Sequence, residues 1–307
     1  MSTSTPDTED SGRIERWVTR AIYRPERLYR VLFYVAVFGF LFGTLFPFYW
    51  LFVIAVTPRE LLGTVGLTPQ AFHWQSFVEV FEVVPFHMYV ANSIMLAFGT
   101  TAIVLVVASL AGYVFGRLEF PGRRPLLLVV LAISYFPPAA FFVPLYRLFA
   151  GNISLFGISS PNVLNTPAAL LPPFTALFMP LAIFILTTFY AQIPDGLEDA
   201  ARIEGTTRLG ALVRVIIPLS APGVATVAVL TFIYVYNEFF FSFLMTTGEY
   251  TDWSPLVYGI RNYQTQYTQL YNLMGAASLI GVLPVAILVA FAQEKIVSGL
   301  TAGALKE

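Results

Sequence analysis

The chain alternates between long apolar stretches and short polar segments. Six stretches are rich in Leu, Val, Ile, Phe and Ala and contain almost no charged residues, namely 31–56, 89–115, 126–149, 168–190, 220–245 and 271–292. Each approaches or exceeds the ~20 residues that a helix needs to cross the hydrocarbon core of a bilayer. The pattern therefore predicts an all-α polytopic membrane protein with about six transmembrane helices, which form one domain over residues 31–292.

Two segments allow a second interpretation. The first apolar stretch follows six arginines, as a cleaved signal peptide would, but it is too long for the hydrophobic part of a signal and lacks a small-residue cleavage site. The segment 150–173, GNISLFGISSPNVLNTPAALLPPF, mixes Gly, Asn, Ser and Pro with apolar residues. We expect an external loop there, with a partly buried or re-entrant piece or a short extra helix.

The Lys and Arg residues predict the orientation of the chain. Fourteen of the 17 lie in residues 1–30, the loop 116–125, the segment 191–219 and residues 293–307, and the other three are Arg59, Arg147 and Arg261. Loops rich in Lys and Arg stay on the cytoplasmic side of a membrane. We therefore expect a partly disordered cytoplasmic N-terminal extension (1–30), a cytoplasmic C-terminal tail (293–307) and a multi-pass protein of the cell membrane.

Composition supports a membrane protein and argues against several activities. Hydrophobic residues make up 57% of the chain and charged residues 11%, against about a quarter charged residues in soluble domains. The net charge of −1 argues against nucleic-acid binding. The chain has no cysteine, no phosphate-binding GxxxxGK[ST] loop, no HExxH and no GxSxG, and its two histidines, His73 and His87, fall in a predicted external loop. We expect no enzyme activity, no metal site and no cofactor bound by this chain.

A small set of polar residues lies within the predicted spans. Glu238 in FIYVYNEFFFSF is ionisable, and Asn237 precedes it. A carboxylate inside a bilayer is costly, so it usually faces a cavity or a partner group. One interpretation places Asn237 and Glu238 on a translocation path, with Tyr234, Tyr236 and Asn92 as weaker candidates. The other assigns these side chains to helix packing and helix–helix hydrogen bonds, or places Glu238 near the membrane surface.

The charged stretch 198–219, EDAARIEGTTRLGALVRVIIPL, separates two apolar stretches. We expect a first helix over 196–204, begun by a capping box in which Asp195 is the cap and Glu198 its partner. Gly205 then allows a backbone turn that other residues resist. The predicted result is a helix–turn–helix on the cytoplasmic face.

The second helix of this stretch should begin at a cap provided by Thr206 or Thr207 and end at Pro218. Its apolar residues recur at the spacing of a buried helix face, namely Leu209, Leu212, Val213 and Ile216. Ala200 and Ala201 on the first helix would allow close approach of a partner. Docking to another protein and lying on the membrane surface as an amphipathic loop both remain open from these residues alone.

The stretch DAARIEGTTRLGALVRVIIP resembles the EAA loop of binding-protein-dependent ABC importer permeases. That pattern is EAA, three residues, Gly, nine residues and I-x-L-P, and its positions correspond here to Asp199, Ala200, Ala201, Gly205, Val215, Ile217 and Pro218. Asp replaces Glu, Val replaces Ile and Ile replaces Leu, with the spacing kept. Glu198 and Glu204 also fit the acidic positions of the sugar branch of the family.

Other segments support the same resemblance over residues 31–307. FGRLEFPGRR at 115–124 and FPPAAFFVPLY at 136–146 resemble a loop and the following span of the family. YNEF at 236–239 resembles the WNEF of MalG-like sugar permeases, and GLTAGALKE resembles their C-terminal ending. The resemblance implies a type I (MetI-like) importer transmembrane domain, with a core over about 85–292 and cytoplasmic EAA coupling helices within 191–219.

The resemblance also implies partners and a mechanism. The chain would work with a second permease subunit, usually a different chain, with two ATP-binding subunits that use ATP and Mg, with an extracytoplasmic solute-binding protein and with membrane lipid. Sugar would cross by alternating access. Glu198, Asp199 and Gly205 are the expected coupling residues, the acidic pair as polar anchors, and the external loop 246–270 is expected to contact the binding protein. A non-sugar solute (glycerol phosphate, amino acid or peptide) and an ATP-independent secondary transporter remain alternatives.

Overall fold

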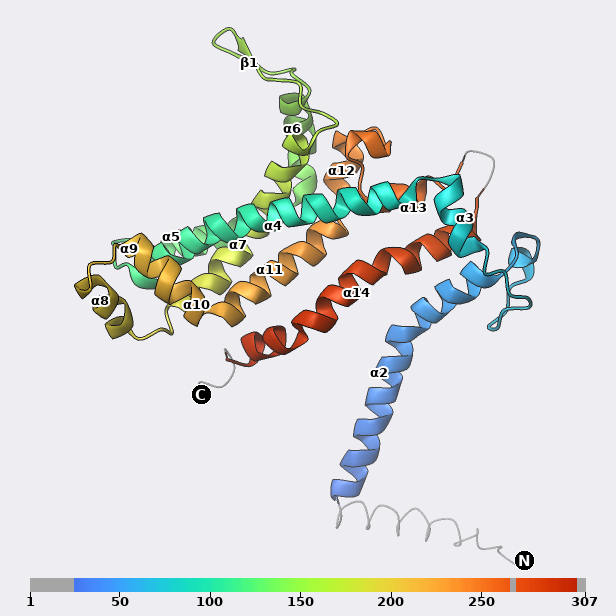
Figure 1. Ribbon diagram of the computed structural model, residues 1–307, viewed down its shortest axis with the longest axis horizontal. Coiled ribbons are helices and arrows are strands. Elements are labelled where there is room, and N and C mark those ends of the chain that lie inside the picture. The colour runs from blue at the N-terminus through green and yellow to red at the C-terminus, as the bar shows by residue number, and fades with distance from the viewer. Residues whose placement is uncertain (1–24, 266–268, 303–307) are drawn as a thin grey trace, which may run out of the picture.

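Four long helices dominate the computed structural model, which describes residues 25–265 and 269–302 (Figure 1). They are α2 (Pro25–Val56), α4 (Phe86–Arg117), α7 (Pro167–Tyr190) and α14 (Tyr271–Ala302). Each is long and apolar enough to cross a membrane. Two pairs of shorter helices bent by 83°, Arg123–Ile133 with Pro138–Phe149 and Arg208–Leu219 with Ala221–Tyr236, bring the number of candidate spans to as many as six. The predicted all-α membrane fold with about six spans is confirmed. The boundary expected at residue 292 does not end a helix, because α14 continues to Ala302.

The third predicted span, 126–149, is broken rather than straight. It consists of α5 (Arg123–Ile133), the 3₁₀ turn η2 (Pro138–Phe141) and α6 (Phe142–Phe149), with a bend of 83° between its two arms. Pro137 and Pro138 explain the break, because proline lacks an amide hydrogen and disfavours helical backbone in the preceding residue.

The fifth predicted span, 220–245, is also two helices. α11 (Ala221–Tyr236) ends before Asn237, and α12 (Phe240–Met245) begins three residues later. The Glu238 carboxylate accepts hydrogen bonds from the backbone N–H groups of Phe241 (2.8 Å) and Ser242 (3.3 Å). These are N–H groups that the first turn of a helix leaves unpaired, so the acidic side chain stabilises a new helix start.

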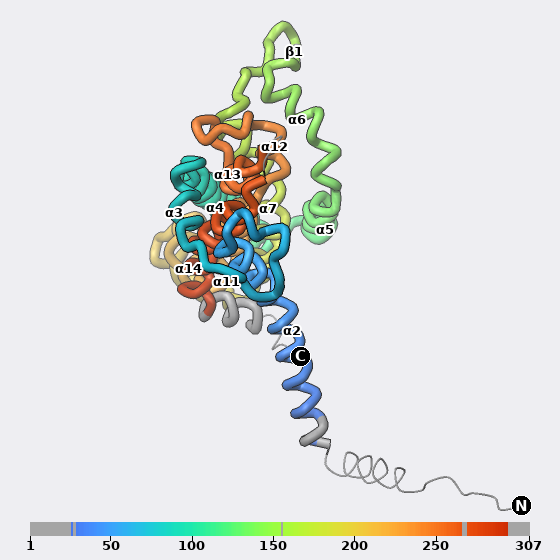
Figure 2. Tube along the Cα trace, turned by 90° about the vertical axis from the view of Figure 1, so that its right-hand side faces the viewer, coloured from blue at the N-terminus to red at the C-terminus, as the bar shows by residue number. Residues whose placement is uncertain are grey.

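Residues 167–173 of the predicted external loop 150–173 are the first turns of α7 and not a separate short helix. The rest of the loop, 150–166, contains no helix. It forms a hairpin of two short antiparallel strands, β1 (Ser154–Leu155) and β2 (Ile158–Ser159), linked through Gly157 at φ +80°. Figures 1 and 2 show that this hairpin and the N-terminal part of α2 leave the central bundle on opposite sides.

The remaining short elements lie at the two ends of α4. α8 (Asp195–Ile203), α9 (Arg208–Ala211), the π-helical turn η3 (Leu212–Ile216) and α10 (Ile217–Leu219) precede α11. η1 (Arg59–Thr64), α3 (Ser76–Val83), η4 (Tyr250–Asp252) and α13 (Leu256–Arg261) make up the second group. Figure 1 shows α8 and α9 at one end of α4 and α3 and α13 at the other, so α4 runs the length of the bundle.

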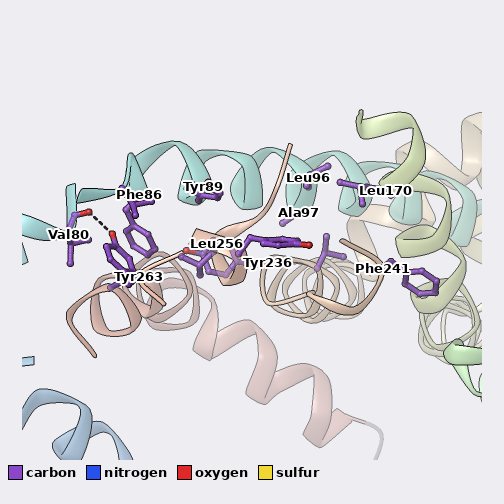
Figure 3. Packing of buried hydrophobic residues seen from close by; sticks show 14 of the residues in the cluster. Val80, Phe86, Tyr89, Leu96, Ala97, Leu170, Tyr236, Phe241, Leu256 and Tyr263 are labelled. Carbon is purple, nitrogen blue, oxygen red and sulfur yellow. Dashed lines mark hydrogen bonds between the residues drawn. The ribbon is translucent and has the colours of Figure 1, made fainter. Parts of the chain in front are cut away.

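The bundle is built around α4, which packs against α7 and α11. Two glycines allow the approach to α7: a Cβ on Gly112 would lie 2.9 Å from that of Leu186, and one on Gly116 would lie 3.1 Å from the Thr187 carbonyl. Small residues at such contacts are typical of membrane helices, which associate mainly by close packing. Figure 3 shows the core at the N-terminal end of α4, where the ring of Phe86 lies beside that of Tyr263, whose hydroxyl donates to the Val80 carbonyl.

Most of the described side chains of α2 are exposed. Its last turn is buried at Val53, Ala55 and Val56, where Gly275 of α14 approaches the Leu51 carbonyl. The large apolar side chains of its first half are exposed, among them Val31, Phe33, Phe38, Phe40 and Phe42. Such a surface requires lipid or another protein around it. The expectations for residues 1–24 and 303–307 lie outside the described residues.

Candidate functional site

The segment 191–219 folds as the predicted helix–turn–helix, which we call the coupling arm. Gly205 lies at φ +92° between α8 and α9, which confirms the expected turn. The Thr207 hydroxyl accepts a hydrogen bond from the Gly210 N–H at 3.1 Å, which confirms the second helix cap. The expected capping box is wrong: Pro194 occupies the start of α8, and neither acidic side chain caps it.

Arg117 at the end of α4 holds the coupling arm in place. Its Nε lies 3.0 Å from Glu198 Oε2 and its Nη1 lies 2.9 Å from Asp195 Oδ1. Nη1 also donates to the Ile193 carbonyl at 2.6 Å. The Tyr113 hydroxyl, one turn earlier on α4, donates to the other oxygen of Glu198. Asp195 and Glu198 therefore pair with α4 because its last two turns offer a guanidinium to both and a hydroxyl to Glu198.

Glu198 is an internal anchor rather than a surface group. Only 7% of the residue is exposed, and Arg117 beside it is equally enclosed. Burial alone would raise the pKa of Glu198, but the hydrogen bonds from Tyr113 and Arg117 and the positive charge of Arg117 outweigh burial and lower the pKa. The carboxylate is thus held in its charged form, with its two oxygens occupied by α4. Glu198 therefore binds α4 of its own chain, and its expected role as a polar anchor for an ATPase stays a prediction.

The outer surface of the coupling arm carries most of the other residues of the EAA pattern, whereas Val215 and Ile217 are half-buried. Asp199, Ala200, Glu204, Gly205 and Pro218 are exposed, and Ala201 is half-buried. Five exposed apolar side chains accompany them, namely Leu197, Ile203, Leu209, Val213 and Leu219. Ile203 is 87% exposed, which is unusual beside so many charged groups.

The predicted apolar stripe of the second helix is only half correct. Leu212 and Ile216 are buried as expected, whereas Leu209 and Val213 are exposed. The helix does not keep one regular spacing, because residues 212–216 form a π-helical turn. The wider turn separates the four positions onto two faces, one packed on the bundle and one outward.

A cavity of about 790 Å³ lies where α11 breaks and faces the break between α5 and α6. Its lining includes three of the predicted path residues, Tyr234, Asn237 and Glu238, together with Phe178 and Phe240. Tyr234 is 64% exposed, and its ring lies 4.7 Å from that of Phe178. A smaller cavity of about 320 Å³ shares Pro138, Leu177 and Phe241 with it. Aromatic and aliphatic side chains make up most of the lining, to which Asn237 and Glu238 add polar groups.

The other two predicted path residues lie elsewhere. Tyr236 is fully buried and donates its hydroxyl to the Gly281 carbonyl of α14 at 2.8 Å. Asn92 is 8% exposed, and its amide donates to the carbonyls of Tyr250 and Ser254. Neither lines the cavity, and both join segments that are distant in sequence. The mean hydropathy around them gave no indication of these partners.

Sequence reasoning missed Arg117 and Tyr113 as the α4 residues that hold the segment 191–219. The available signal was charge: Arg117 ends an apolar helix on the same predicted side as the acidic pair of the coupling arm, where opposite charges can meet. Within residues 25–265 and 269–302, no group of three or more His, Asp or Glu side chains is arranged to hold a metal ion.

Comparison with known proteins assigns the chain to a family. Residues 105–301 match the model of the binding-protein-dependent transport system inner membrane component. The sulfoquinovosyl glycerol permease SmoH of Agrobacterium fabrum is 34% identical over 89% of this chain and 93% of its own length. The trehalose/maltose permease MalG of Thermococcus litoralis is 33% identical over 92% of this chain and 99% of its own length.

The fold has a counterpart among solved structures. A chain of a bacterial ABC transporter that imports the acidic polysaccharide alginate superposes with a TM-score of 0.72 over 89% of this chain and 98% of that chain, at 19% identity. A family match over well over half of the residues, joined to relatives above 30% identity, settles membership. This chain is a membrane transport component, and it belongs to the family of inner membrane permeases of binding-protein-dependent transport systems.

Proposed function

We propose that this chain is one permease subunit of an ATP-driven sugar importer. It pairs with a second, different permease chain and with two cytoplasmic subunits that hydrolyse ATP with Mg. An extracytoplasmic binding protein delivers the sugar, and the N- and C-termini lie in the cytoplasm. The observation that carries the proposal is the coupling arm, which presents exposed Asp199 and apolar side chains outward while Arg117 fastens it to α4.

The composition of the coupling arm favours protein docking over contact with lipid. Its exposed apolar residues, such as Ile203, alternate with charged residues that lipid would not accommodate, such as Asp199 and Glu204. A buried interface of mixed apolar and polar groups is typical of protein–protein contacts. An ATPase groove that receives α8 would then move α4 together with the arm, because Arg117 ties them at 3.0 Å or less.

Sugar is the substrate class that the cavity and the relatives favour. SmoH, MalG of Thermococcus litoralis and the trehalose permease SugB of Mycobacterium tuberculosis carry names of carbohydrate or glycoside transporters. The cavity beside Tyr234 combines aromatic rings with the polar side chains of Asn237 and Glu238, a combination that can stack on a sugar ring and bind its hydroxyls. We therefore assign these three residues to the translocation path.

The proposal can be tested by isolating the chain from its native membrane with the proteins bound to it. We expect mass spectrometry to identify an ATPase, a second permease and a binding protein. We expect ATPase activity of the reconstituted complex to rise several-fold with the binding protein and one of maltose, trehalose or sulfoquinovosyl glycerol. Solute uptake by the chain alone, without ATP, would instead establish a secondary transporter. Stimulation by an amino acid or a peptide alone would move the substrate to another class.

A further inference from the structure

Helix α4 carries a second set of attachments at the end opposite to the coupling arm. The Tyr89 hydroxyl donates to the Gly248 carbonyl at 2.9 Å. The Asn92 amide donates to the Tyr250 carbonyl at 2.7 Å and to the Ser254 carbonyl at 3.1 Å. The Ser93 hydroxyl accepts from the Leu256 N–H at 2.8 Å. These bonds join the first two turns of α4 to one loop about 160 residues later in the chain.

The loop that α4 holds is itself cross-linked. The Ser254 hydroxyl donates to the Thr246 hydroxyl at 3.0 Å and accepts from the Gly248 N–H at 3.1 Å. The Asn262 amide donates to both the Tyr89 hydroxyl and the Gly248 carbonyl. Buried hydrogen-bond networks of this kind are stiff, because breaking one bond leaves a polar group unpaired inside the protein. Residues 246–262 therefore move with the start of α4, and we call them the anchored loop.

The two sets of attachments lie far apart on one helix. Asn92 and Arg117 are separated by 25 residues, or roughly 38 Å at the rise of an α-helix. Figure 1 shows α13, which belongs to the anchored loop, near one end of α4 and α8 near the other. A displacement at one end can reach the other only if the helix between them does not bend.

The sequence of α4 suits it to that purpose. Among the four long helices of the described residues, α2 contains Pro47, α7 contains three prolines and α14 contains Pro284, whereas α4 contains none. Prolines interrupt the hydrogen-bond ladder and are the usual places where a helix kinks. The other candidate spans are bent pairs at 83°. α4 is thus the described span with an uninterrupted ladder from end to end.

We infer that α4 is a rigid connecting rod between the two faces of the transporter, with Asn92 and Arg117 as the positioning residues at its ends. A binding protein that docks on the anchored loop displaces α4, and α4 displaces α8 of the coupling arm. The inference rests on the proposed function, which supplies a binding protein on one side and an ATPase on the other. It adds the route by which one partner acts on the other.

The test removes the attachment at the anchored loop and measures the effect at the coupling arm. In the reconstituted complex, Asn92→Leu should lower the ratio of binding-protein-stimulated to basal ATPase activity at least fivefold. Hydrogen–deuterium exchange supplies a direct readout. In the wild type the binding protein should change the exchange of amides 195–204, and in Asn92→Leu that change should vanish. The binding protein is loaded with whichever of maltose, trehalose or sulfoquinovosyl glycerol stimulates the wild-type complex most.

A milder variant and a matched control protect this test against misfolding. Tyr89→Phe removes two buried hydrogen bonds between α4 and the anchored loop, one to the Gly248 carbonyl and one from the Asn262 amide, and should lower the same ratio about twofold or more. Tyr263→Phe removes a bond of the same kind, from a buried tyrosine hydroxyl to a backbone carbonyl, but that bond reaches Val80 of α3 rather than α4. Tyr263→Phe should keep the wild-type ratio. Equal losses of ATPase stimulation in Tyr89→Phe and Tyr263→Phe would show that stimulation depends on the general packing of this region and not on the attachment of the loop to α4.

A double variant tests whether the two ends act in series. Arg117→Lys keeps the charge but loses the fork that reaches Glu198, Asp195 and the Ile193 carbonyl together. If both residues act through the same helix, the double variant Asn92→Leu, Arg117→Lys should be no more impaired than the worse single variant. Its stimulation ratio should therefore equal the lower of the two single-variant ratios. Losses that multiply would overturn the inference.

The outcomes separate the inference from the function on which it rests. If the wild-type complex shows no stimulation by the binding protein, the proposed function fails. If the wild type is stimulated and Asn92→Leu keeps both the ratio and the exchange change at residues 195–204, the connecting rod is refuted and the importer function stands.

Discussion

Arg117, the last residue of α4, donates from Nε to Oε2 of Glu198 in α8 over 3.0 Å, across 81 residues of sequence. The pair is enclosed, and Arg117 uses Nη1 to reach Asp195 and the Ile193 carbonyl at the same time. A buried pair of this kind fixes geometry, because losing either partner leaves a charge without compensation. The pair therefore decides how the coupling arm is oriented on the membrane helices.

The two acidic residues at the start of the EAA pattern should differ in what they do. Glu198→Gln removes the charge from a buried pair and should lower the stability of the complex by about 1–3 kcal/mol. Asp199→Asn changes an exposed side chain, so its thermal unfolding should match the wild type while its ATPase stimulation and its hold on the ATPase weaken. Thermal unfolding in detergent and co-purification of the ATPase measure the two effects. Equal unfolding temperatures for Glu198→Gln and the wild type would contradict the anchor role of Glu198.

The stability contributed by Glu198 should depend on pH in one direction. Its pKa in the folded protein lies below the ordinary value of 4.5, so the unfolded chain binds the proton more readily. The contribution is present above that value and is lost as pH falls through the lower, folded-state pKa. We expect the difference in unfolding temperature between wild type and Glu198→Gln to be constant from pH 7 to about pH 5 and to shrink below pH 4.5. A difference that grows on acidification would contradict this assignment.

Gly205 should tolerate side chains according to their backbone preference. Its φ of +92° disfavours residues with a Cβ, while no atom lies within 4 Å of the position that a Cβ would take. Gly205→Ala should therefore cost about 1–2 kcal/mol through backbone strain alone and reduce sugar-stimulated ATPase activity. Gly205→Asn should cost less, because Asn adopts the left-handed conformation more readily.

Gly196 provides the control for this substitution. It is exposed on α8 of the same coupling arm, and a Cβ added there would also have no atom within 4 Å, but its backbone is helical. Gly196→Ala should be neutral or slightly stabilising by helix propensity. If both alanine variants reduce ATPase stimulation equally, the effect comes from added bulk at a docking surface and not from the turn.

The cavity at the break of α11 should depend on Tyr234. Tyr234→Ala removes an exposed ring that faces Phe178 and should lower sugar uptake about tenfold, with little change in thermal unfolding. Tyr236→Phe is the matched control: it removes a hydroxyl bond to the Gly281 carbonyl outside the cavity and should lower stability by about 1 kcal/mol while uptake per folded complex is kept. Normal uptake in Tyr234→Ala together with reduced uptake per folded complex in Tyr236→Phe would show that the translocation path does not pass through this cavity.

The breaks within two spans mark a limit of hydropathy. Apolar content predicted one span over 220–245. In the structure, Glu238 instead accepts hydrogen bonds from the N–H groups of Phe241 and Ser242, and a new helix begins there. The sequence also makes Glu238 a candidate for the translocation path. In the structure its carboxylate forms these local hydrogen bonds as well. At 126–149 the two prolines that break the span were visible in the sequence, but the 83° bend depends on packing around them.

Some features of this protein are set by neighbouring residues in the sequence, and others are set by contacts between distant segments. The sequence by itself determined the membrane class, the approximate spans, the Gly205 turn, a threonine cap at 206 or 207 and the position of the coupling arm, because apolar length, backbone freedom and capping act within a few residues. Only the tertiary structure decided that Glu198 faces Arg117, that Asn92 holds the loop 246–262 and that Tyr234 faces a cavity while Tyr236 does not. Those outcomes depend on which helix faces which, and close packing of α4 on α7 and α11, not residue type, sets that arrangement.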